Sequence, residues 1–504
     1  MDIVLSIDLG TTGLKVGLVS TDGKVEASAS AEYPIESPQP GYAEQDPEQW
    51  WQALIKCCSS LKASHPKLFS QVAGIGICGQ MHTQAHLDSS MQVVRPAITW
   101  MDQRSSTIAE MINRDKTKKA AVFQETQNVA TTTYTAAHLK WIKDNQPDIW
   151  AKISHVLVAK DFLKFRLTGE MAIDYSDASG TLLFNVKDRC WSETMFDLFE
   201  VPAGLLPEAK PSDEIIGTVT EQAARATGLK TGTPMANGSA DCSTAALGAG
   251  MVKSGQVTLI IGTAGVVAVC ADQPLPDPQD RTICWNYCLR DKWVMMGITQ
   301  TAGESLNWFR TAFDQNGEKG QSSRDVFEQY NNAIKEIPDG SDGLLFLPYL
   351  NGERTPYWDS NARGVFFGIN LATRKAHFIK AIMEGVSFAL RHCMETLESL
   401  GIAVDQVMAV GGGLKSETWL NTLGKILKKP IRTVGLADTG LVGNMLICSK
   451  ALGLSSSIPE AVEKISTYDR EVHFPDPHTT YEKQYKQFLA LYADLKDRFK
   501  MAST

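Results

Sequence analysis

Near the start of the chain, two mostly apolar runs flank a short loop of small and polar residues. Residues 3–7 form the first run, Asp8 follows it, and residues 14–19 resume the apolar pattern beyond the loop Gly10–Gly13. Short apolar runs bounded by glycine predict buried strands. The pattern therefore predicts a β-hairpin whose loop is rich in glycine and threonine.

The same pattern recurs about 250 residues downstream. Residues 257–261 and 266–270 are mostly apolar and flank the small-residue loop Gly262–Gly265. A repeat of this length indicates a duplicated domain rather than the short period of a solenoid. The glycine-rich segment 239–250 precedes the second copy. We therefore expect an α/β fold of two domains, residues 1–249 and 250–504.

Helical periodicity is readable in three places. A helix is predicted to begin after Asp46, a typical N-cap residue, and apolar residues at three- and four-residue steps predict another over 379–400. A terminal helix is predicted over 480–501. Residues 406–410 read as a strand that leads into Gly411–Gly413.

Composition narrows the partners and the compartment. The 504 residues carry a net charge of −8, so the chain lacks the basic balance that nucleic acids or anionic membranes require. No apolar run reaches the ~18 residues of a membrane span, and the N-terminus does not resemble a signal peptide. The ten cysteines are scattered through apolar segments, which favours a reduced, cytoplasmic setting.

The two loops are candidates for holding phosphate. A strand that ends in a carboxylate, Asp8, followed by glycines and by Thr11 and Thr12, can hold a hydrated Mg²⁺ and donate hydrogen bonds to phosphate oxygens. An ordinary hairpin that uses glycine for its turn is the alternative. The second loop, with Gly262 and Thr263, favours phosphate binding, because two such loops facing each other can clamp a triphosphate.

Gly411–Gly413 lie between a predicted strand and a predicted helix. Glycines at this point let a ligand approach the backbone, and the helix start offers free N–H groups. A tight strand–helix turn is the alternative, and the chain contains no Walker-type loop.

Polar side chains also follow two other predicted strands. His82 comes after the buried run 72–78, where it can hydrogen-bond a polyol or serve as a satisfied interior histidine. Trp100 to Arg104 end the next strand, and there Asp102 and Arg104 can bind sugar hydroxyls or pair with each other.

Asp241 begins a run of small residues that suits a closely packed helix. A carboxylate at a helix start is expected to stay ionised, because the helix dipole favours the charge. Such a weak base suffices for phosphoryl transfer, where the attacking hydroxyl loses its proton late. The alternative is a helix N-cap, a common role of Asp.

Several blocks together carry a family resemblance. They are Ile7–Thr12, Trp100–Arg104, Lys160-Asp161, Leu167–Gly169, Asp177–Gly180, Gly262-Thr263, Phe346–Pro356, Ala362–Gly364 and Gly411–Gly413. In this order and spacing the chain resembles the FGGY carbohydrate kinases, which belong to the actin-like, ribonuclease-H-like ATPases.

The resemblance implies two actin-like (ribonuclease-H-like) ATPase domains, with sugar and MgATP bound in the cleft between them. Roles carry over by motif. Asp8 would hold Mg²⁺ through water and Asp241 would be the general base. Phosphate and nucleotide contacts would come from Thr11, Thr12, Gly262, Thr263, Gly412 and Gly413.

Within the family, Glu44–Trp51 and Gly79–His82 are most similar to members that phosphorylate D-xylulose. That likeness implies that Met81 and His82 touch the sugar beside Asp241, with Trp100 and Asp102 nearby.

Four departures from the xylulose-specific pattern bear on substrate choice. Thr83 and Cys242 replace the usual Gly and Asn at positions expected to abut the sugar. His138 replaces a Lys, and Asn444-Met445 replaces a small pair expected near the adenine.

We therefore expect a cytoplasmic, ATP-dependent kinase that acts on D-xylulose. The alternatives are a kinase for another ketose, polyol or sugar acid (ribulose, erythritol, glycerol or gluconate), an actin- or chaperone-like ATPase that acts on a protein partner, and a sugar-binding regulator without catalysis. Partners are expected to be the sugar and ATP, with a homodimer as the candidate oligomer.

Overall fold

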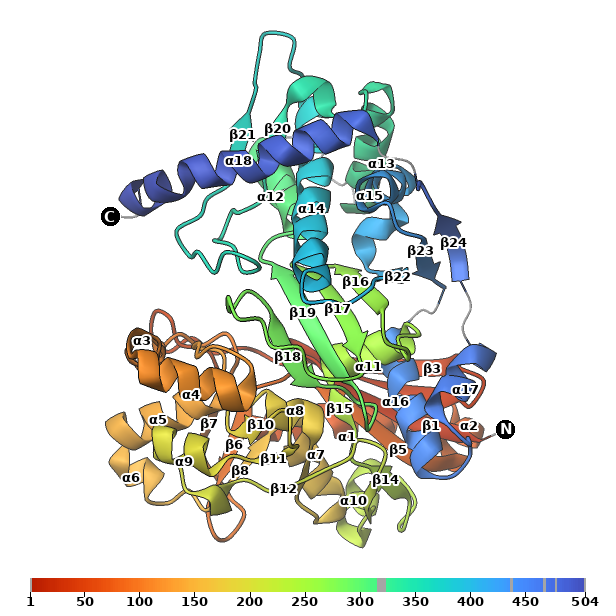
Figure 1. Ribbon diagram of the computed structural model, residues 1–504. Helices are drawn as coiled ribbons and strands as arrows, with labels where there is room; N and C mark the ends of the chain where they lie inside the picture. The colour runs from red at the N-terminus through yellow and green to blue at the C-terminus, as the bar shows by residue number, and fades with distance from the viewer. Residues whose placement is uncertain (1, 315–322, 436–437, 466–467, 476–477, 503–504) are drawn as a thin grey trace.

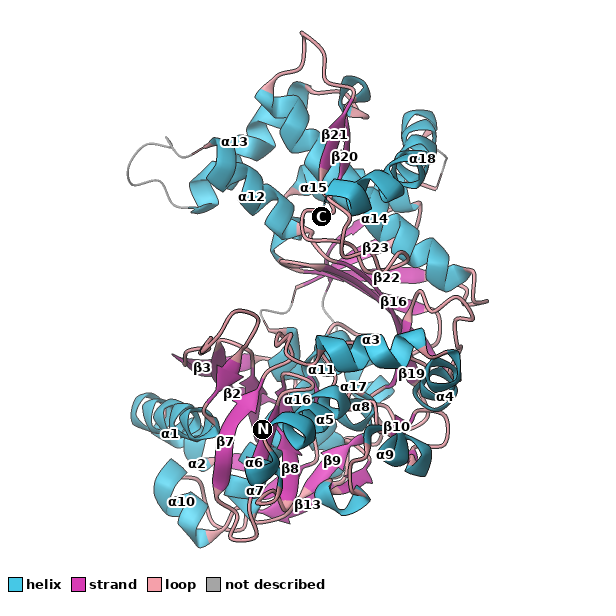
Figure 2. Cartoon of the chain, turned by 90° about the vertical axis from the view of Figure 1, so that its left-hand side faces the viewer, coloured by secondary structure: helices cyan, strands magenta, loops and turns pink. Residues whose placement is uncertain are grey.

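Two lobes, each built on a seven-stranded sheet, make up the protein (Figures 1 and 2). The computed structural model describes residues 2–314, 323–435, 438–465, 468–475 and 478–502. The predicted α/β class is confirmed, and both predicted hairpins form, each at the centre of one large sheet.

The first sheet has the order β13-β14-β5-β1-β2-β3, with β15 also pairing with β5. Its strands are β1 (Ile3–Leu9), β2 (Gly13–Ser20), β3 (Val25–Glu32), β5 (Val72–Gly79), β13 (Ile215–Thr218), β14 (Pro234–Ala236) and β15 (Ser239–Ala240). Strand β1 runs antiparallel to β2 and parallel to β5, and Leu9 pairs with Gly79. Because Ala240 of β15 also pairs with Gly79, the carboxyl ends of β1, β5 and β15 meet at one edge.

The second sheet repeats this plan in the order β18-β19-β17-β16-β22-β23-β24. Its strands are β16 (Gln256–Ile261), β17 (Gly265–Ala271), β18 (Ile283–Asn286), β19 (Trp293–Thr299), β22 (Gln406–Val410), β23 (Ile431–Val434) and β24 (Tyr468–Val472). Strand β16 runs antiparallel to β17 and parallel to β22, as β1 does to β2 and β5. The duplication predicted from the two hairpins therefore extends to their neighbouring strands.

Smaller sheets surround these two. They contain β4 (Glu44–Gln45), β6 (Gln84–Leu87), β7 (Val93–Ile98), β8 (His155–Val158), β9 (Ala172–Asp174), β10 (Phe184–Asn185), β11 (Cys190–Trp191), β12 (Glu208–Lys210), β20 (Leu345–Leu347) and β21 (Val365–Phe367).

Helices cover both large sheets. In the N-terminal part they are α1 (Pro47–Ser64), α2 (Pro66–Ser70), α3 (Ser106–Arg114), α4 (Lys116–Thr126), α5 (Thr135–Asn145), α6 (Pro147–Trp150), α7 (Ala159–Thr168), α8 (Tyr175–Ser179), α9 (Glu193–Phe199), α10 (Glu221–Thr227) and α11 (Asp241–Gly248). In the C-terminal part they are α12 (Gly303–Phe313), α13 (Ser323–Ala333), α14 (Lys375–Glu398), α15 (Glu417–Leu427), α16 (Thr439–Ala451), α17 (Ile458–Ile465) and α18 (Thr479–Ala502).

The predicted helices are confirmed, with small shifts at their ends. Asp46 is the N-cap of α1, where its side chain accepts from the N–H of Glu48. The helix predicted over 379–400 is α14, which packs on β17 and β19, and the terminal helix is α18. Among the described residues, no helix is long and apolar enough to cross a membrane.

Helix α16 lies in sequence between β23 and β24 of the second sheet but packs on the first, against β1 and β5 (Figure 1). Its contact with α11 is so close that a Cβ at Gly443 would lie 2.1 Å from the carbonyl oxygen of Thr244, so only glycine fits. Asn444 donates to the carbonyl of Ile7 at 2.8 Å. The division into residues 1–249 and 250–504 remains a prediction. Helix α16 belongs to the second of these segments in sequence but packs on the sheet of the first.

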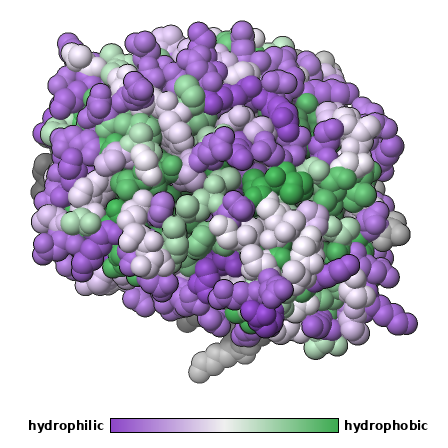
Figure 3. Space-filling model, turned by 90° about the horizontal axis from the view of Figure 1, so that it is seen from below, coloured by the Kyte–Doolittle hydropathy of each residue, from purple (hydrophilic) through white to green (hydrophobic). Residues whose placement is uncertain are grey.

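The outer surface of the N-terminal lobe is ordinary. Seen from below, hydrophilic side chains surround separate apolar patches (Figure 3). Scattered apolar groups are normal on a protein surface, so this face does not by itself indicate a binding site.

Candidate active site

Asp8 lies at the carboxyl end of β1, beside Cys78 of β5 and Lys15 of β2. The Cys78 thiol contacts its Oδ1 at 3.5 Å. Burial raises the pKa of Asp8 to about 6, and the neighbouring charge of Asp438 adds to the rise, while Cys78 and Lys15 lower it. The ionised form of Asp8 is therefore disfavoured in the folded protein, and a cation nearby would stabilise it.

The loop after β1 is braced from one side and open on the other. The N–H of Gly10 donates to the carbonyl of Gly13 at 3.0 Å and closes the turn. The indole N–H of Trp100 donates to the Thr11 hydroxyl at 3.0 Å, so Trp100 supports the loop directly. Thr12 is exposed.

The loop after β16 has the same character. The N–H of Gly262 donates to the carbonyl of Ala264 at 3.1 Å, and the carbonyl of Gly262 accepts from Gly303 at the start of α12. These bonds fix the backbone of the loop and leave the exposed Thr263 at its tip.

The triple glycine lies beside this second loop. Gly411 has φ = 119°, and a Cβ there would lie 2.4 Å from the carbonyl oxygen of Ile261, which immediately precedes Gly262. Gly412 has no heavy atom within 4 Å of its Cβ position, so its face is open to a ligand. The predicted nucleotide-binding glycines, Gly262, Gly412 and Gly413, thus lie together.

Asp241 is the first residue of α11, directly after β15. Ala240 occupies the N-cap position, so the N-cap alternative is wrong. The Oδ1 of Asp241 accepts from the N–H of Cys242 at 2.6 Å. Burial nevertheless raises the pKa of Asp241 to about 7, the charge of Asp8 raises it further, and the Cys242 N–H opposes the rise. The sequence argument that the helix start keeps this acid ionised is therefore corrected.

Met81 and His82 form a tight turn at the end of β5. The N–H of Thr83 donates to the carbonyl of Met81 at 2.7 Å, and His82 has φ = 66°, a strained value for a residue other than glycine. The Sγ of Cys242 lies 3.6 Å from the Sδ of Met81, which brings Met81 next to Asp241. The turn therefore presents both predicted sugar contacts beside the predicted base.

The protonation state of His82 follows from its surroundings. Its Nδ1 lies 2.5 Å from the carbonyl oxygen of Gly180, which can only accept, so Nδ1 carries the proton. Burial lowers the pKa of His82 to about 4, hence the ring is neutral at pH 7. Its Nε2 is consequently an acceptor, suited to a sugar hydroxyl.

Two expected sugar neighbours are directed elsewhere. Asp102 is fully buried, and its carboxylate accepts from the Arg104 guanidinium and from the N–H of Ala43. Of the two alternatives drawn from the sequence, Asp102 and Arg104 pair with each other. Thr83 is also fully buried. Its hydroxyl donates to the Gln80 side chain and accepts from the backbone N–H of Trp100, so the expectation that it abuts the sugar is wrong.

Of the other departures from the xylulose-specific pattern, one lies beside Asp241 and the rest are buried away from it. Cys242 contacts Met81 and is partly exposed beside Asp241. His138 is fully buried, 3.5 Å from Gln84, and burial lowers its pKa to about 4. Asn444 and Met445 are buried in α16 against the first sheet, which corrects the expectation that they lie near the adenine.

A buried charged cluster behind Asp241 was not anticipated. The N–H of Ala240 donates to the Ser176 hydroxyl at 3.0 Å, and that hydroxyl donates to Asp174. Lys160 pairs with Asp174 at 2.8 Å and also with Asp161 and Asp177. The blocks Lys160-Asp161 and Asp177–Gly180 were visible in the sequence, but pairing across a fold leaves no local signal.

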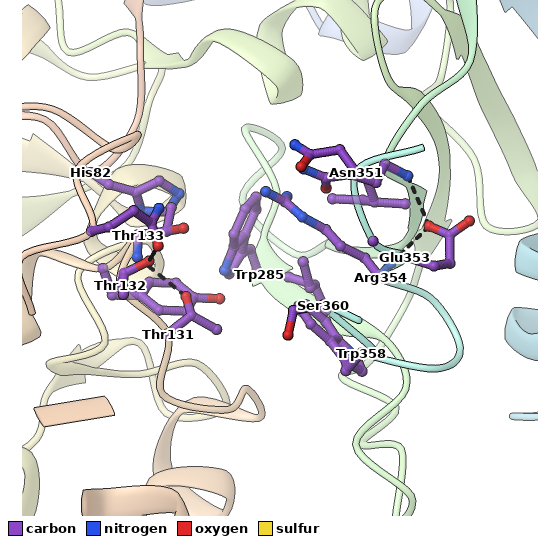
Figure 4. A pocket seen from close by; sticks show the side chains of 16 residues that line it. His82, Thr131, Thr132, Thr133, Trp285, Asn351, Glu353, Arg354, Trp358 and Ser360 are labelled. Atoms are coloured by element: carbon purple, nitrogen blue, oxygen red, sulfur yellow. Dashed lines mark hydrogen bonds between the residues drawn. The ribbon is translucent and has the colours of Figure 1, made fainter. Parts of the chain in front are cut away.

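A pocket of about 290 Å³ opens beside His82 between the two lobes (Figure 4). The N-terminal lobe contributes Gln103 and Thr131–Tyr134, and the C-terminal lobe contributes Trp285 and Arg354. Sequence reasoning assigned none of these a ligand, although Arg354 lies in a block that carried the resemblance.

The fold and the site define a two-domain ATPase of the ribonuclease-H-like, actin-like class. The models of the FGGY family of carbohydrate kinases match residues 3–248 (N-terminal domain) and 257–452 (C-terminal domain). The chain belongs to this family and is therefore a carbohydrate kinase that uses ATP as co-substrate.

Similar proteins span the whole chain. A xylulose kinase of Bacillus subtilis is 32% identical and covers 100% of this chain and 98% of its own length. The crystal structure of a "xyloylose kinase" from Brucella ovis has a TM-score of 0.90 at 31% identity, covering 98% and 99% of the two chains. That of a gluconate kinase from Lactobacillus acidophilus has a TM-score of 0.92 at 26% identity, covering 99% of each chain.

Proposed function

We propose that this kinase phosphorylates D-xylulose to D-xylulose 5-phosphate, with Asp241 as the general base. The observation that carries the role of Asp241 is its place near Asp8: the two acids lie at the carboxyl ends of β15 and β1, and both strands pair with β5 in one sheet. The similarity to xylulose kinases over the full chain supports the choice of sugar.

The reaction follows from this arrangement. The sugar hydroxyl attacks the γ-phosphorus of ATP in line, the γ-phosphorus–oxygen bond to ADP breaks, and Asp241 takes the hydroxyl proton. Thr12 and Thr263 donate to phosphate oxygens from opposite loops, while Gly412 and Gly413 line the nucleotide. The protein contributes mainly by positioning the sugar and the triphosphate, because phosphoryl transfer requires no covalent bond between substrate and protein.

Asp8 suits a water-mediated ligand of Mg²⁺. Burial raises the pKa of both acids; the charge of Asp438 raises that of Asp8 further, and the charge of Asp8 raises that of Asp241 further, so a cation here would stabilise both carboxylates. Within the described residues, no group of three or more His, Cys, Asp or Glu is arranged to hold a metal by itself. This fits an ion that arrives with the triphosphate, since Mg²⁺ is usually bound by one or two carboxylates plus phosphates, and it would supply charge neutralisation.

At the sugar end, His82 offers Nε2 as an acceptor and Met81 packs beside the acceptor site. Trp100 acts through Thr11, and Asp102 acts through Arg104 by fixing the segment after β7. Cys242 is the one departure that we place in the sugar site, because its sulfur contacts Met81 next to Asp241.

A coupled assay of ADP release across D-xylulose, D-ribulose, erythritol, glycerol and D-gluconate tests this function. We expect the highest kcat/KM with D-xylulose. A clear preference for D-gluconate would replace the proposed sugar and keep the kinase. ATP hydrolysis that no sugar accelerates would favour a protein-directed ATPase and would refute the proposal.

We also propose a compartment and an assembly for this kinase. All ten cysteines are free, which suits a reducing cytoplasm where ATP is available. A homodimer is the assembly we propose, and light scattering after size-exclusion chromatography measures it.

A further inference from the structure

The pocket between the lobes contains a cation, the guanidinium of Arg354. Arg354 follows β20 in a loop of the C-terminal lobe and extends toward Trp285, opposite His82 (Figure 4). Among the described residues, no hydrogen bond or ion pair engages its guanidinium; its backbone N–H donates to Glu353, and its carbonyl accepts from the N–H groups of Tyr357 and Trp358. A half-buried guanidinium with five unused N–H donors can bind the oxygen atoms of a ligand.

The carboxylate of the neighbouring Glu353 interacts with the charge of Arg354 but forms its hydrogen bonds with other groups. Glu353 is buried, and its carboxylate accepts from the Thr299 hydroxyl at 2.7 Å and from the backbone N–H groups of Gln300 and Arg354. These bonds tie the loop to the end of β19. Glu353 thus fixes the backbone from which Arg354 projects and leaves the guanidinium to the pocket.

On the other side of the pocket, His82 connects the surroundings of Arg354 to the proposed site of the acceptor sugar. The ring of His82 lies 5.5 Å from that of Trp285 and 5.1 Å from that of Tyr134. A continuous series of contacts leads from Asp241 through Cys242 and Met81 to His82, and His82 lines the pocket. A chain-like acceptor with one hydroxyl at Asp241 would extend past His82 toward Arg354.

The geometry points to Arg354 as a ligand of the acceptor sugar, binding oxygen atoms at the end remote from the phosphorylated hydroxyl. This inference rests on the proposed function. The ligand chemistry is a pair of oxygens that accept from one guanidinium, either the carbonyl and hydroxyl oxygens of a ketose or the carboxylate of a sugar acid. Because Arg354 comes from the C-terminal lobe and His82 from the N-terminal lobe, the bound sugar would join the lobes.

Calorimetric titration of the full chain with D-xylulose, D-ribulose and D-gluconate, in the presence of ADP, tests the assignment. Arg354→Gln removes the charge, Arg354→Lys keeps it without the fork, and Arg225→Gln is the matched control on exposed α10. We expect Arg354→Gln to raise the Kd of the bound sugar at least about tenfold, the worth of a hydrogen bond to a charged group. Arg354→Lys should recover part of the affinity, and ADP affinity should stay within about twofold.

The outcomes separate this inference from the proposed function. If the wild type binds a sugar and Arg354→Gln binds it equally well, the Arg354 assignment fails while the sugar kinase stands. If the wild type binds no sugar of the panel, both fail. A larger loss for D-gluconate than for D-xylulose supports Arg354 as a carboxylate ligand, and an equal loss supports binding to hydroxyl and carbonyl oxygens. Thermal denaturation of each variant confirms that it is folded.

Discussion

The two hairpins at the centres of the two sheets share a backbone plan but differ in charge. Both loops begin with a glycine whose N–H closes the turn, and both present a threonine at the tip. Two residues before that glycine, the first hairpin has Asp8 and the second has Ile260. The first loop is also one residue longer, since Leu9 pairs with Leu14 whereas Ile261 pairs with Gly265.

This difference suggests how a duplicated unit came to hold an asymmetric substrate. Either hairpin can donate hydrogen bonds to phosphate, but only the first brings a carboxylate to the strand edge where Asp241 lies. In the proposed mechanism, the residue that holds the metal and the residue that takes the proton, Asp8 and Asp241, both belong to the N-terminal lobe. The C-terminal lobe offers neutral donors to the nucleotide and, through Arg354, a cation to the sugar.

The strongest test of this asymmetry is Asp241→Asn. The amide keeps the shape but cannot take the hydroxyl proton, so kcat should fall about 10³–10⁴-fold, at the upper end for a lost general base. The KM values for sugar and ATP should change little. Asp148→Asn, an exposed acid on α6, is the control in the coupled assay of ADP release. Turnover within a few-fold of wild type would remove Asp241 from the chemistry.

A smaller but still large loss is expected at Asp8. Asp8→Asn should lower kcat/KM about 10²–10³-fold, because charge neutralisation by a metal ion is worth several kcal/mol in the transition state. The double variant Asp8→Asn/Ile260→Asp moves the carboxylate to the other hairpin. We expect no recovery in the assay across a Mg²⁺ titration, because Ile260 is not at the strand edge of Asp241. Recovery would show that the hairpins are interchangeable.

The burial of Asp241, together with the nearby charge of Asp8, predicts a dependence of stability on pH. Asp241 faces Asp8 on β1 and the thiols of Cys78 and Cys242, and its folded pKa of about 7 exceeds the ordinary 3.8. A raised folded pKa means that the folded protein binds the proton more tightly. The stability from this group is therefore full below pH 3.8 and is lost as pH rises through about 7.

Asp241→Asn removes this titration. The variant should gain roughly 2 kcal/mol over wild type between pH 5 and pH 8, since each unit of pKa shift is worth about 1.4 kcal/mol. Urea unfolding at both pH values, without nucleotide, measures the difference. An equal gap between variant and wild type at the two values would mean that the pKa of Asp241 is not raised in the folded protein.

The hairpins were predictable from the sequence because their signal is local. Apolar runs, glycines and threonines within 13 residues specify each one, and the repeat links them. The position of Asp241 was predicted too, since it follows from the motif. Its pKa was not, because burial and the charge of Asp8 depend on which strands are neighbours in the sheet.

The orientation of side chains around the sugar was harder to predict. The turn at His82 depends on Gly180, 98 residues away, and once it forms Thr83 points into the protein. Asn444 was expected near the nucleotide, yet it holds β1 because α16 crosses back to the first sheet. The pocket with Arg354 is assembled from distant segments of both lobes, so no window of sequence contains it.

The smallest effect is expected from substitutions at the tips of the two loops, Thr12 and Thr263. Thr12→Val and Thr263→Val each remove one hydroxyl and keep the side-chain volume, so each should raise the KM for ATP about tenfold, the worth of one hydrogen bond to a charged phosphate. Thr311→Val, at an exposed position on α12, is the matched control. Because both loops would bind one triphosphate, the two single effects should be similar in size. A tenfold effect at Thr263 with none at Thr12 would mean that the phosphates are held from the C-terminal lobe alone. In that case the first hairpin would serve only to carry Asp8.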